Sequence, residues 1–187
     1  SLTPGALVIS IAAGITIDSM ASWLGSETAI VRCMPNTPAL LGCGATGLFA
    51  NAQVSAKQQG QAEQVLSAVG ILNWVPREKD LDAVTALSGS GPAYFFLFME
   101  AMIDAAIAQG LDRETATRLA QQTGLGAARM ALESDVDLVE LRRRVTSPGG
   151  TTQAAVESFE AAGLRNVVSQ AMQAAADRAD EMAREMG

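Results

Sequence analysis

The stretch Val145–Thr152, which reads Val-Thr-Ser-Pro-Gly-Gly-Thr-Thr, contains the residue types that could bind a small anion. Ser147 is a favourable helix N-cap, and Pro148 suits the first helical position, where the missing N–H costs nothing. Two glycines then leave the backbone of the first turn bare, and two threonines follow with uncharged hydroxyls. The N–H groups of such a turn have no partners inside the helix, so they can bind a carboxylate. The alternative is an ordinary capped helix start without a ligand.

Composition excludes several other kinds of chemistry. The 187 residues are 49% apolar and carry a formal charge of −7, which argues against nucleic acid and anionic membrane as partners. The chain has no histidine, so a Ser-His-Asp triad, a histidine base and a histidine metal site are excluded, and we expect no metal.

The two cysteines indicate a reducing compartment. Cys33 and Cys43 are too few for a zinc site without histidine, and a chain of this size does not need a disulfide. We therefore expect free thiols in a cytoplasmic protein. No leader sequence opens the chain, and the most apolar run, Ala93–Ile103, is broken by Glu100, so we expect no membrane span.

The first third of the chain alternates short apolar runs with helical patterns, which predicts a mainly parallel sheet with helices on its faces. We expect strands over residues 7–11, 29–34, 45–50 and 71–75. We also expect helices over residues 17–24 and 55–69, with Thr16 and Ser55 as their N-caps. Ligands of such sheets bind at the carboxyl ends of the strands. This principle points to Ala12, Ala13 and the turn that begins at Met34.

The segment Gly42–Gly47 matches the G-x-G-x-x-G dinucleotide pattern, but its context is wrong. The pattern has meaning only between a strand and the helix that it opens. Here a strand-like segment follows and no helix begins at Gly47, so we do not expect it to bind a pyrophosphate.

From Arg77–Asp80 onward the composition changes, and no strand pattern follows. We therefore expect two domains, residues 1–79 with the sheet and residues 80–187 with helices only. We expect a break or kink in the helix at Ser88–Pro92, because Pro92 has no N–H to donate to the preceding turn. The helix over Ala93–Gln109 is apolar on nearly all sides, so we expect a second subunit to cover it.

Two later helices carry interpretable signals. Asp112 should cap a helix that runs to about Glu133, where two glycines suggest a tight helix crossing. Asp137 should cap the next one, which ends in three arginines, Arg142–Arg144. These arginines either form a solvated face favoured by the helix dipole, or one of them binds a phosphate. The apolar stripe over residues 164–186 indicates a core or an interface.

Three segments, Arg32–Pro38, Ala86–Tyr94 and Val145–Thr152, together resemble Δ1-pyrroline-5-carboxylate reductase in order and spacing. That family reduces a cyclic imine to proline with NADPH or NADH. The resemblance covers essentially the whole chain, and Ile9–Gly14 also fits. It implies the end of a Rossmann domain followed by a helical dimerisation domain, in interlocked homodimers that often form rings. The family's opening glycine-rich turn is not in this sequence, so we expect the chain to be the latter part of a longer protein.

The resemblance also implies roles for particular residues. The substrate carboxylate would be held by Ser147 and by the backbone N–H groups of Gly150, Thr151 and Thr152, and the Thr152 hydroxyl would hydrogen-bond the ring nitrogen. Asp135 lies where relatives often carry a glutamate near the substrate amine, and Arg144 lies near the cofactor. The implied substrate residues are Ser147, Gly149, Gly150, Thr151, Thr152 and Asp135, and the implied cofactor residues are Ala12, Ala13, Met34, Pro35, Asn36 and Arg144.

The implied chemistry suits these residue types, because hydride transfer to a C=N carbon needs neither a nucleophile nor a metal. The chain must hold the carboxylate, place the imine carbon and let a proton reach nitrogen. Two alternatives stay open. The chain could be a dimerisation module without catalytic activity, or part of a related reductase that acts on another small acid.

Overall fold

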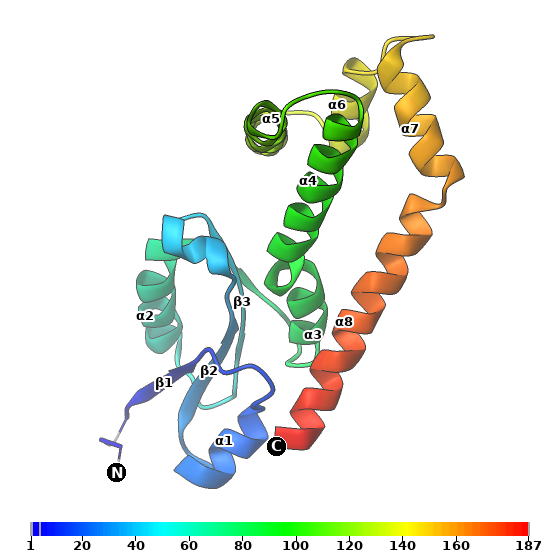
Figure 1. Ribbon diagram of the computed structural model, residues 1–187. Coiled ribbons are helices and arrows are strands. Elements are labelled where there is room, and N and C mark those ends of the chain that lie inside the picture. Colours follow the sequence, from blue (N-terminus) through cyan, green and yellow to red (C-terminus); the bar gives the residue numbers. More distant parts are fainter. Residues whose placement is uncertain (1, 4, 187) are drawn as a thin grey trace. The chain divides into compact units, whose positions relative to one another are not determined.

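The structure is a computed structural model that describes residues 2–3 and 5–186 (Figure 1). It divides into two compact units, one formed by Ser1–Pro92 with Gln170–Gly187 and the other by Ala93–Ser169. These units reflect packing within one chain. The predicted domain boundary between residues 79 and 80 is a different division and stays a prediction.

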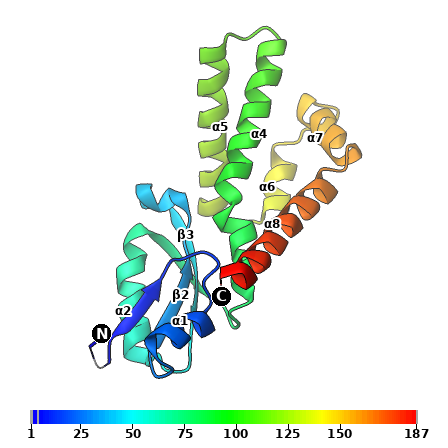
Figure 2. The same ribbon diagram turned by 60° about the horizontal axis from the view of Figure 1, so that its bottom comes forward.

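The first unit is built on a four-stranded sheet with helices on both faces (Figures 1 and 2). Its elements are β1 (Leu7–Ser10), α1 (Ile17–Leu24), β2 (Ala29–Met34), the 3₁₀ helix η1 (Thr37–Leu41), β3 (Gly44–Ala50), α2 (Ala56–Leu66), the 3₁₀ helix η2 (Ser67–Val69), β4 (Gly70–Trp74) and α3 (Asp80–Val84). Alternate residues of β2 point to opposite faces, so Val31 and Cys33 pack against α2 while Ile30 packs against α1. All six residues of β2 are buried, as its apolar run predicted.

The sheet is mixed, and the expectation of a mainly parallel sheet is wrong for its central pair. β1 and β2 are parallel, as are β3 and β4, but β2 and β3 are antiparallel. Only Pro35–Cys43 joins them, and a parallel crossover needs a dozen residues or more. The carboxyl ends of β1 and β2 and the amino end of β3 therefore lie at one edge of the sheet.

The G-x-G-x-x-G match runs into a strand and opens no helix, as predicted. Gly42 has φ +70 and ends η1, whereas Gly44 and Gly47 lie within β3. A Cβ atom on Gly47 would lie 2.7 Å from Cγ1 of Val84, so glycine allows α3 to pack closely on the strand.

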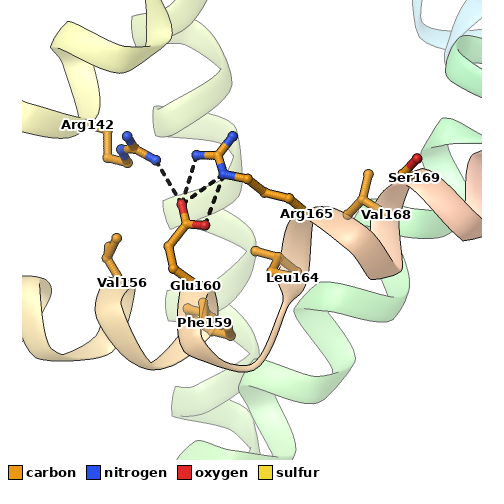
Figure 3. A pocket seen from close by; sticks show the side chains of 8 residues that line it. All are labelled: Arg142, Val156, Phe159, Glu160, Leu164, Arg165, Val168 and Ser169. Atoms are coloured by element: carbon orange, nitrogen blue, oxygen red, sulfur yellow. Dashed lines mark hydrogen bonds and ion pairs between the residues drawn. The ribbon is translucent and has the colours of Figure 1, made fainter.

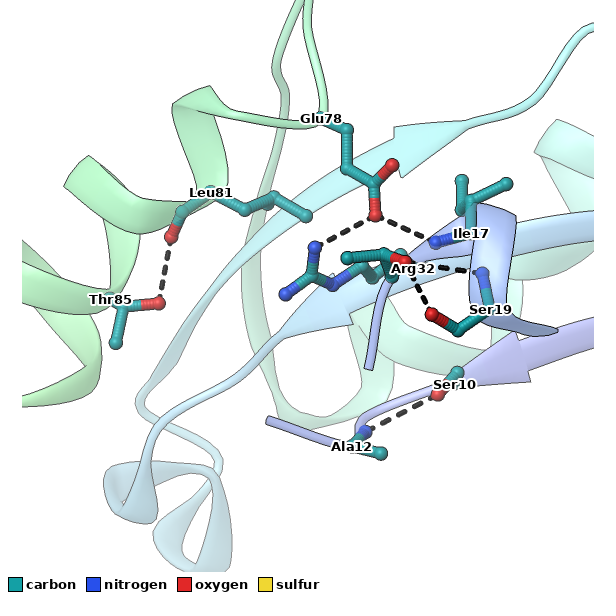
Figure 4. A network of polar contacts seen from close by, with 9 residues as sticks. Ser10, Ala12, Ile17, Ser19, Arg32, Glu78, Leu81 and Thr85 are labelled. Atoms are coloured by element: carbon teal, nitrogen blue, oxygen red, sulfur yellow. Dashed lines mark hydrogen bonds and ion pairs between the residues drawn. The ribbon is translucent and has the colours of Figure 1, made fainter. Parts of the chain in front are cut away.

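A buried ion pair ties the sheet to the segment before α3 (Figure 4). Arg32 of β2 is only 5% exposed, and its Nη1 donates to Oε1 of Glu78 at 2.8 Å. The same oxygen accepts the backbone N–H of Ile17, the first residue of α1, also at 2.8 Å. Glu78 thus neutralises a buried guanidinium and satisfies an unpaired helix N-terminus.

The end of the last helix, α8 (Leu164–Met186), returns to this first unit. Gly14 is buried at φ +74, and a Cβ atom there would lie 3.1 Å from Sδ of Met186 and 3.3 Å from the carbonyl oxygen of Met182. The turn after β1 therefore packs against a segment far away in the sequence.

Both cysteines are free thiols, as expected. Cys33 of β2 is fully buried against α2, and burial raises the pKa of its thiol to about 12. Cys43 is exposed after η1.

The predicted break at Ser88–Pro92 is a π-helical turn. α3 continues into the π-helix η3 (Thr85–Gly89), and α4 (Gly91–Ala108) follows. In the described residues one helical stretch, Asp80–Ala108, is long and apolar enough to cross a membrane by length and composition alone. Little of that stretch is buried within the single chain.

The second unit is entirely helical over its described residues. It holds most of α4, then α5 (Arg113–Glu133), α6 (Leu138–Arg144), α7 (Thr151–Ala161) and the start of α8. Asp112 caps α5 as predicted by accepting the N–H of Thr115 at 2.9 Å. The predicted tight crossing is confirmed at Gly124, where a Cβ atom would lie 2.5 Å from Cε of Met99, whereas nothing lies within 4 Å of Gly126.

Candidate functional site

The loop before α7 differs from the predicted capped helix start. Gly149 has φ +69, and the N–H of Gly150 donates to the carbonyl oxygen of Ser147 at 3.0 Å. Pro148 at the second position and a left-handed glycine at the third are typical of a type II β-turn. The helix therefore begins at Thr151 with Gly150 as its N-cap, and the prediction that Ser147 caps it is wrong.

Because of this turn, the free amides begin one residue later in the chain than the resemblance implied. The N–H of Gly150 is used by Ser147, and the N–H of Gly149 donates to Oε1 of Gln153 at 2.7 Å. Within the described part of the chain, the N–H groups of Thr151, Thr152 and Gln153 have no hydrogen-bond partner. These three amides form the positive end of the helix, and both threonines are exposed. Gln153 was missed, although its place three residues after the N-cap is where a capping side chain occurs.

The backbone conformation requires glycine at position 149, and close packing favours it at position 150. The positive φ of Gly149 strains any residue with a Cβ atom. A Cβ atom on Gly150 would lie 3.1 Å from the carbonyl oxygen of Ser147. The Gly-Gly pair thus forms the turn and leaves the entrance to α7 without side chains.

The other predicted residues of this unit are exposed. Asp135 lies in the segment between α5 and α6. Arg144 donates from Nε to Oε1 of Glu140 at 2.9 Å, and Arg143 forms two bonds to the same carboxylate. Asp137 caps α6 by accepting the N–H of Glu140, but the carboxylate of Glu140 pairs with the arginines and does not complete a capping box. The arrangement agrees with a solvated arginine face, and phosphate contact by Arg144 stays a prediction.

The carboxyl group of Glu140 should titrate far below its usual range. Hydrogen bonds from Arg143, and then from Arg144, lower its pKa from 4.5 to about 2. Because the pKa is lower in the folded state, this contribution to stability is complete above pH 4.5 and is lost as the pH falls toward 2. A carboxyl-carbon NMR titration should locate the folded pKa. Glu140→Gln should remove this part of the acid sensitivity, and a titration midpoint near 4.5 would contradict the ion pairs.

A second charged cluster joins α6, α7 and α8 (Figure 3). Glu160 accepts from Arg165 at 2.8 Å and from Arg142 at 3.4 Å, and these bonds, Arg165 first, lower the pKa of its carboxyl group. The cluster borders a pocket of about 500 Å³ whose other lining residues are Val156, Phe159, Leu164, Val168 and Ser169. Glu160 pairs with both arginines and the loop residues 147–152 do not line the pocket, so we assign the cluster a structural role.

The predicted cofactor residues of the first unit lie at one edge of the sheet. β1 and β2 are parallel with Ser10 opposite Arg32, so Ala12, just after β1, and Met34, the last residue of β2, lie at neighbouring strand ends. Ala12 and Ala13 are exposed, whereas the side chain of Met34 is buried. The edge therefore offers methyl groups and main chain, which fits a flat nicotinamide ring.

The fold thus defines a class of protein, the end of a Rossmann-type sheet domain joined to a helical domain. A sequence model described as pyrroline-5-carboxylate reductase dimerisation matches residues 78–182. The pyrroline-5-carboxylate reductase of Pseudomonas aeruginosa is 60% identical over 187 residues, covering 100% of this chain and 68% of that protein. The enzyme of the same name from Vibrio alginolyticus is 49% identical over 94% of this chain and 65% of its own length.

Solved structures agree. A pyrroline-5-carboxylate reductase from Coxiella burnetii has a TM-score of 0.91 at 51% identity, covering 94% of this chain and 65% of that one. The Plasmodium falciparum enzyme, solved with NADP bound, has a TM-score of 0.87 at 37% identity, covering 95% and 70%. The chain belongs to the pyrroline-5-carboxylate reductase family, and it spans about two thirds of the length of these relatives.

Proposed function

We propose that this chain is the part of an NAD(P)H-dependent reductase that converts Δ1-pyrroline-5-carboxylate to L-proline, the last step of proline biosynthesis. The observation that carries the proposal is 60% identity, over every residue of the chain, to a protein named for that activity. The Plasmodium falciparum relative with NADP bound supports the cofactor class.

The free amides of Thr151, Thr152 and Gln153 bind the substrate carboxylate at the positive end of α7. Ser147 and the glycine turn keep this end open, and Asp135 contributes near the substrate amine. The Thr152 hydroxyl hydrogen-bonds the ring nitrogen, which gains a proton as the C=N bond is reduced. A bound nicotinamide supplies the hydride that the imine carbon accepts. Ala12, Ala13 and the main chain of Met34–Asn36 orient the ring, and Arg144 contacts the cofactor after releasing Glu140.

The protein acts as a cytoplasmic homodimer, with higher oligomers built from it, and it has no nucleic-acid partner. Support comes from the dimerisation description of residues 78–182 and from the apolar side chains that one chain leaves exposed. Phe95, Phe96 and Leu97 of α4 are 68%, 60% and 67% exposed. A second subunit covers them, so the apolar stretch Asp80–Ala108 lies in an interface and not in a membrane.

NADPH titration and a substrate panel test the proposal on the full-length protein. We expect an NADPH affinity in the micromolar range, which is usual for enzyme ligands. We also expect NADPH to be oxidised when pyrroline-5-carboxylate is added. Failure to bind NADPH would favour a non-catalytic dimerisation module. Binding with turnover only on another small acid would favour a related reductase.

A further inference from the structure

Both functional groups of the Asn36 side chain are used within the first unit. Its Nδ2 donates to the carbonyl oxygen of Ser88 at 3.0 Å, and its Oδ1 accepts the N–H of Ala45 at 2.9 Å. Asn36 follows β2, Ala45 lies in β3, and Ser88 belongs to η3. Both polar atoms of the amide are thus engaged within the protein, although Asn36 lies within the predicted cofactor turn.

The partner in η3 is a carbonyl that lacks its usual α-helical donor. In an α-helix the carbonyl oxygen of Ser88 would accept from the residue four positions later, which is Pro92 and has no N–H. A half-buried carbonyl without a partner is costly, and the side chain of Asn36 supplies the missing donor. The widened helical turn and Asn36 thus form one unit.

The turn is held at both of its ends by η3. A Cβ atom on Gly89 would lie 3.9 Å from Cγ and Sδ of Met34, an ordinary packing distance. Met34 at the start of the turn therefore packs beside η3, and Asn36 at its end is hydrogen-bonded to it. These two contacts should restrain the main chain between Met34 and Asn36.

We propose that Asn36 is a positioning residue for the cofactor: its amide fixes the Met34–Asn36 main chain to the π-helical turn and to β3. The inference rests on the proposed function, because it assumes that this turn flanks the nicotinamide. It assigns Asn36 the role of a support, with the carbonyl oxygen of Ser88 and the imino acid Pro92 as the features that favour it.

The chain offers a matched control in Asn51. Its Oδ1 accepts the N–H of Ile30 at 3.1 Å, and its Nδ2 donates to the carbonyl oxygen of Thr28 at 2.9 Å. Asn51 thus links the other ends of β2 and β3 by the same two kinds of bond. Loss of either amide should destabilise the unit to a similar extent, but only Asn36 adjoins the cofactor turn.

The experiment compares Asn36→Ala, Asn36→Asp and Asn51→Ala in the full-length protein. We expect Asn36→Ala to weaken NADPH affinity about tenfold, the equivalent of one lost hydrogen bond, and Asn51→Ala by less than about twofold. Asn36→Asp keeps an acceptor for Ala45 but faces the Ser88 carbonyl with a carboxylate, so it should also weaken NADPH binding. By hydrogen exchange, the Ala45 amide should lose protection in Asn36→Ala and keep it in Asn36→Asp.

Equal NADPH affinity in Asn36→Ala and the parent protein would overturn the inference, as would equal losses in the Asn36 and Asn51 variants. If Asn36→Ala does not fold, the Asn36→Asp variant decides the matter by the same affinity criterion. A parent protein that binds no NADPH would overturn the proposed function itself. The two failures are therefore distinguishable.

Discussion

Replacing Thr152 with alanine should lower kcat for pyrroline-5-carboxylate about 100-fold, the lower limit for losing a group that assists proton transfer. Thr152 is the second residue of α7, and its exposed hydroxyl lies beside the three free amides of that helix. The substitution keeps all three N–H groups, so the carboxylate should still bind and KM for NADPH should change little. Steady-state kinetics with both substrates varied would measure these effects separately.

Two variants on the same helix complete the test. Thr152→Ser retains a hydroxyl and should recover most of the lost turnover. Ser158→Ala removes an exposed hydroxyl farther along α7, and turnover should stay within about twofold of the parent, as for most surface changes. If Thr152→Ala turns over as fast as Ser158→Ala, the hydroxyl has no part in the reaction and the proton comes from water.

Local signals in the sequence predicted most of the elements. Thr16, Ser55, Asp112 and Asp137 each cap the helix that follows by accepting an N–H three residues on. Such caps depend on one side chain and the next turn, so a single sequence reveals them. The expected α/β segment followed by helices is confirmed by the structure and by its structural relatives.

Features that depend on backbone geometry or on distant contacts were not predictable in this way. Ser147 is a serine like the N-cap Ser55, yet the left-handed Gly149 turns the chain before a helix can start. Asn36 follows a strand end, where ligands usually bind, but its amide nitrogen donates to the carbonyl oxygen of Ser88, 52 residues away. Only the folded backbone shows which polar groups remain free. The candidate site therefore gained the N–H of Gln153, because the three free amides begin one residue later than the resemblance implied.

The buried ion pair is the strongest example of such a distant contact, and removing Glu78 should have the largest effect on stability. Arg32 is 46 residues from Glu78, and its Nε is already buried without a partner in the described structure. Glu78→Ala would leave the guanidinium without its ion-pair partner and remove the acceptor for the N–H of Ile17. We expect a loss of about 3 kcal/mol in the free energy of unfolding, the lower part of the range for breaking a buried pair, because Glu78 is 24% exposed.

Arg77→Ala is the matched control, one residue away from Glu78. It removes the partner of Asp80 from an ion pair whose arginine is 76% exposed, and such pairs contribute at most about 1 kcal/mol. Urea unfolding at one protein concentration would compare the variants, since dimerisation makes stability depend on concentration. Arg32→Met combined with Glu78→Ala should be more stable than Glu78→Ala alone, because it eliminates the stranded charge. If Glu78→Ala is no less stable than Arg77→Ala, water reaches the guanidinium of Arg32. The ion pair would then not hold the sheet, α1 and the segment before α3 together.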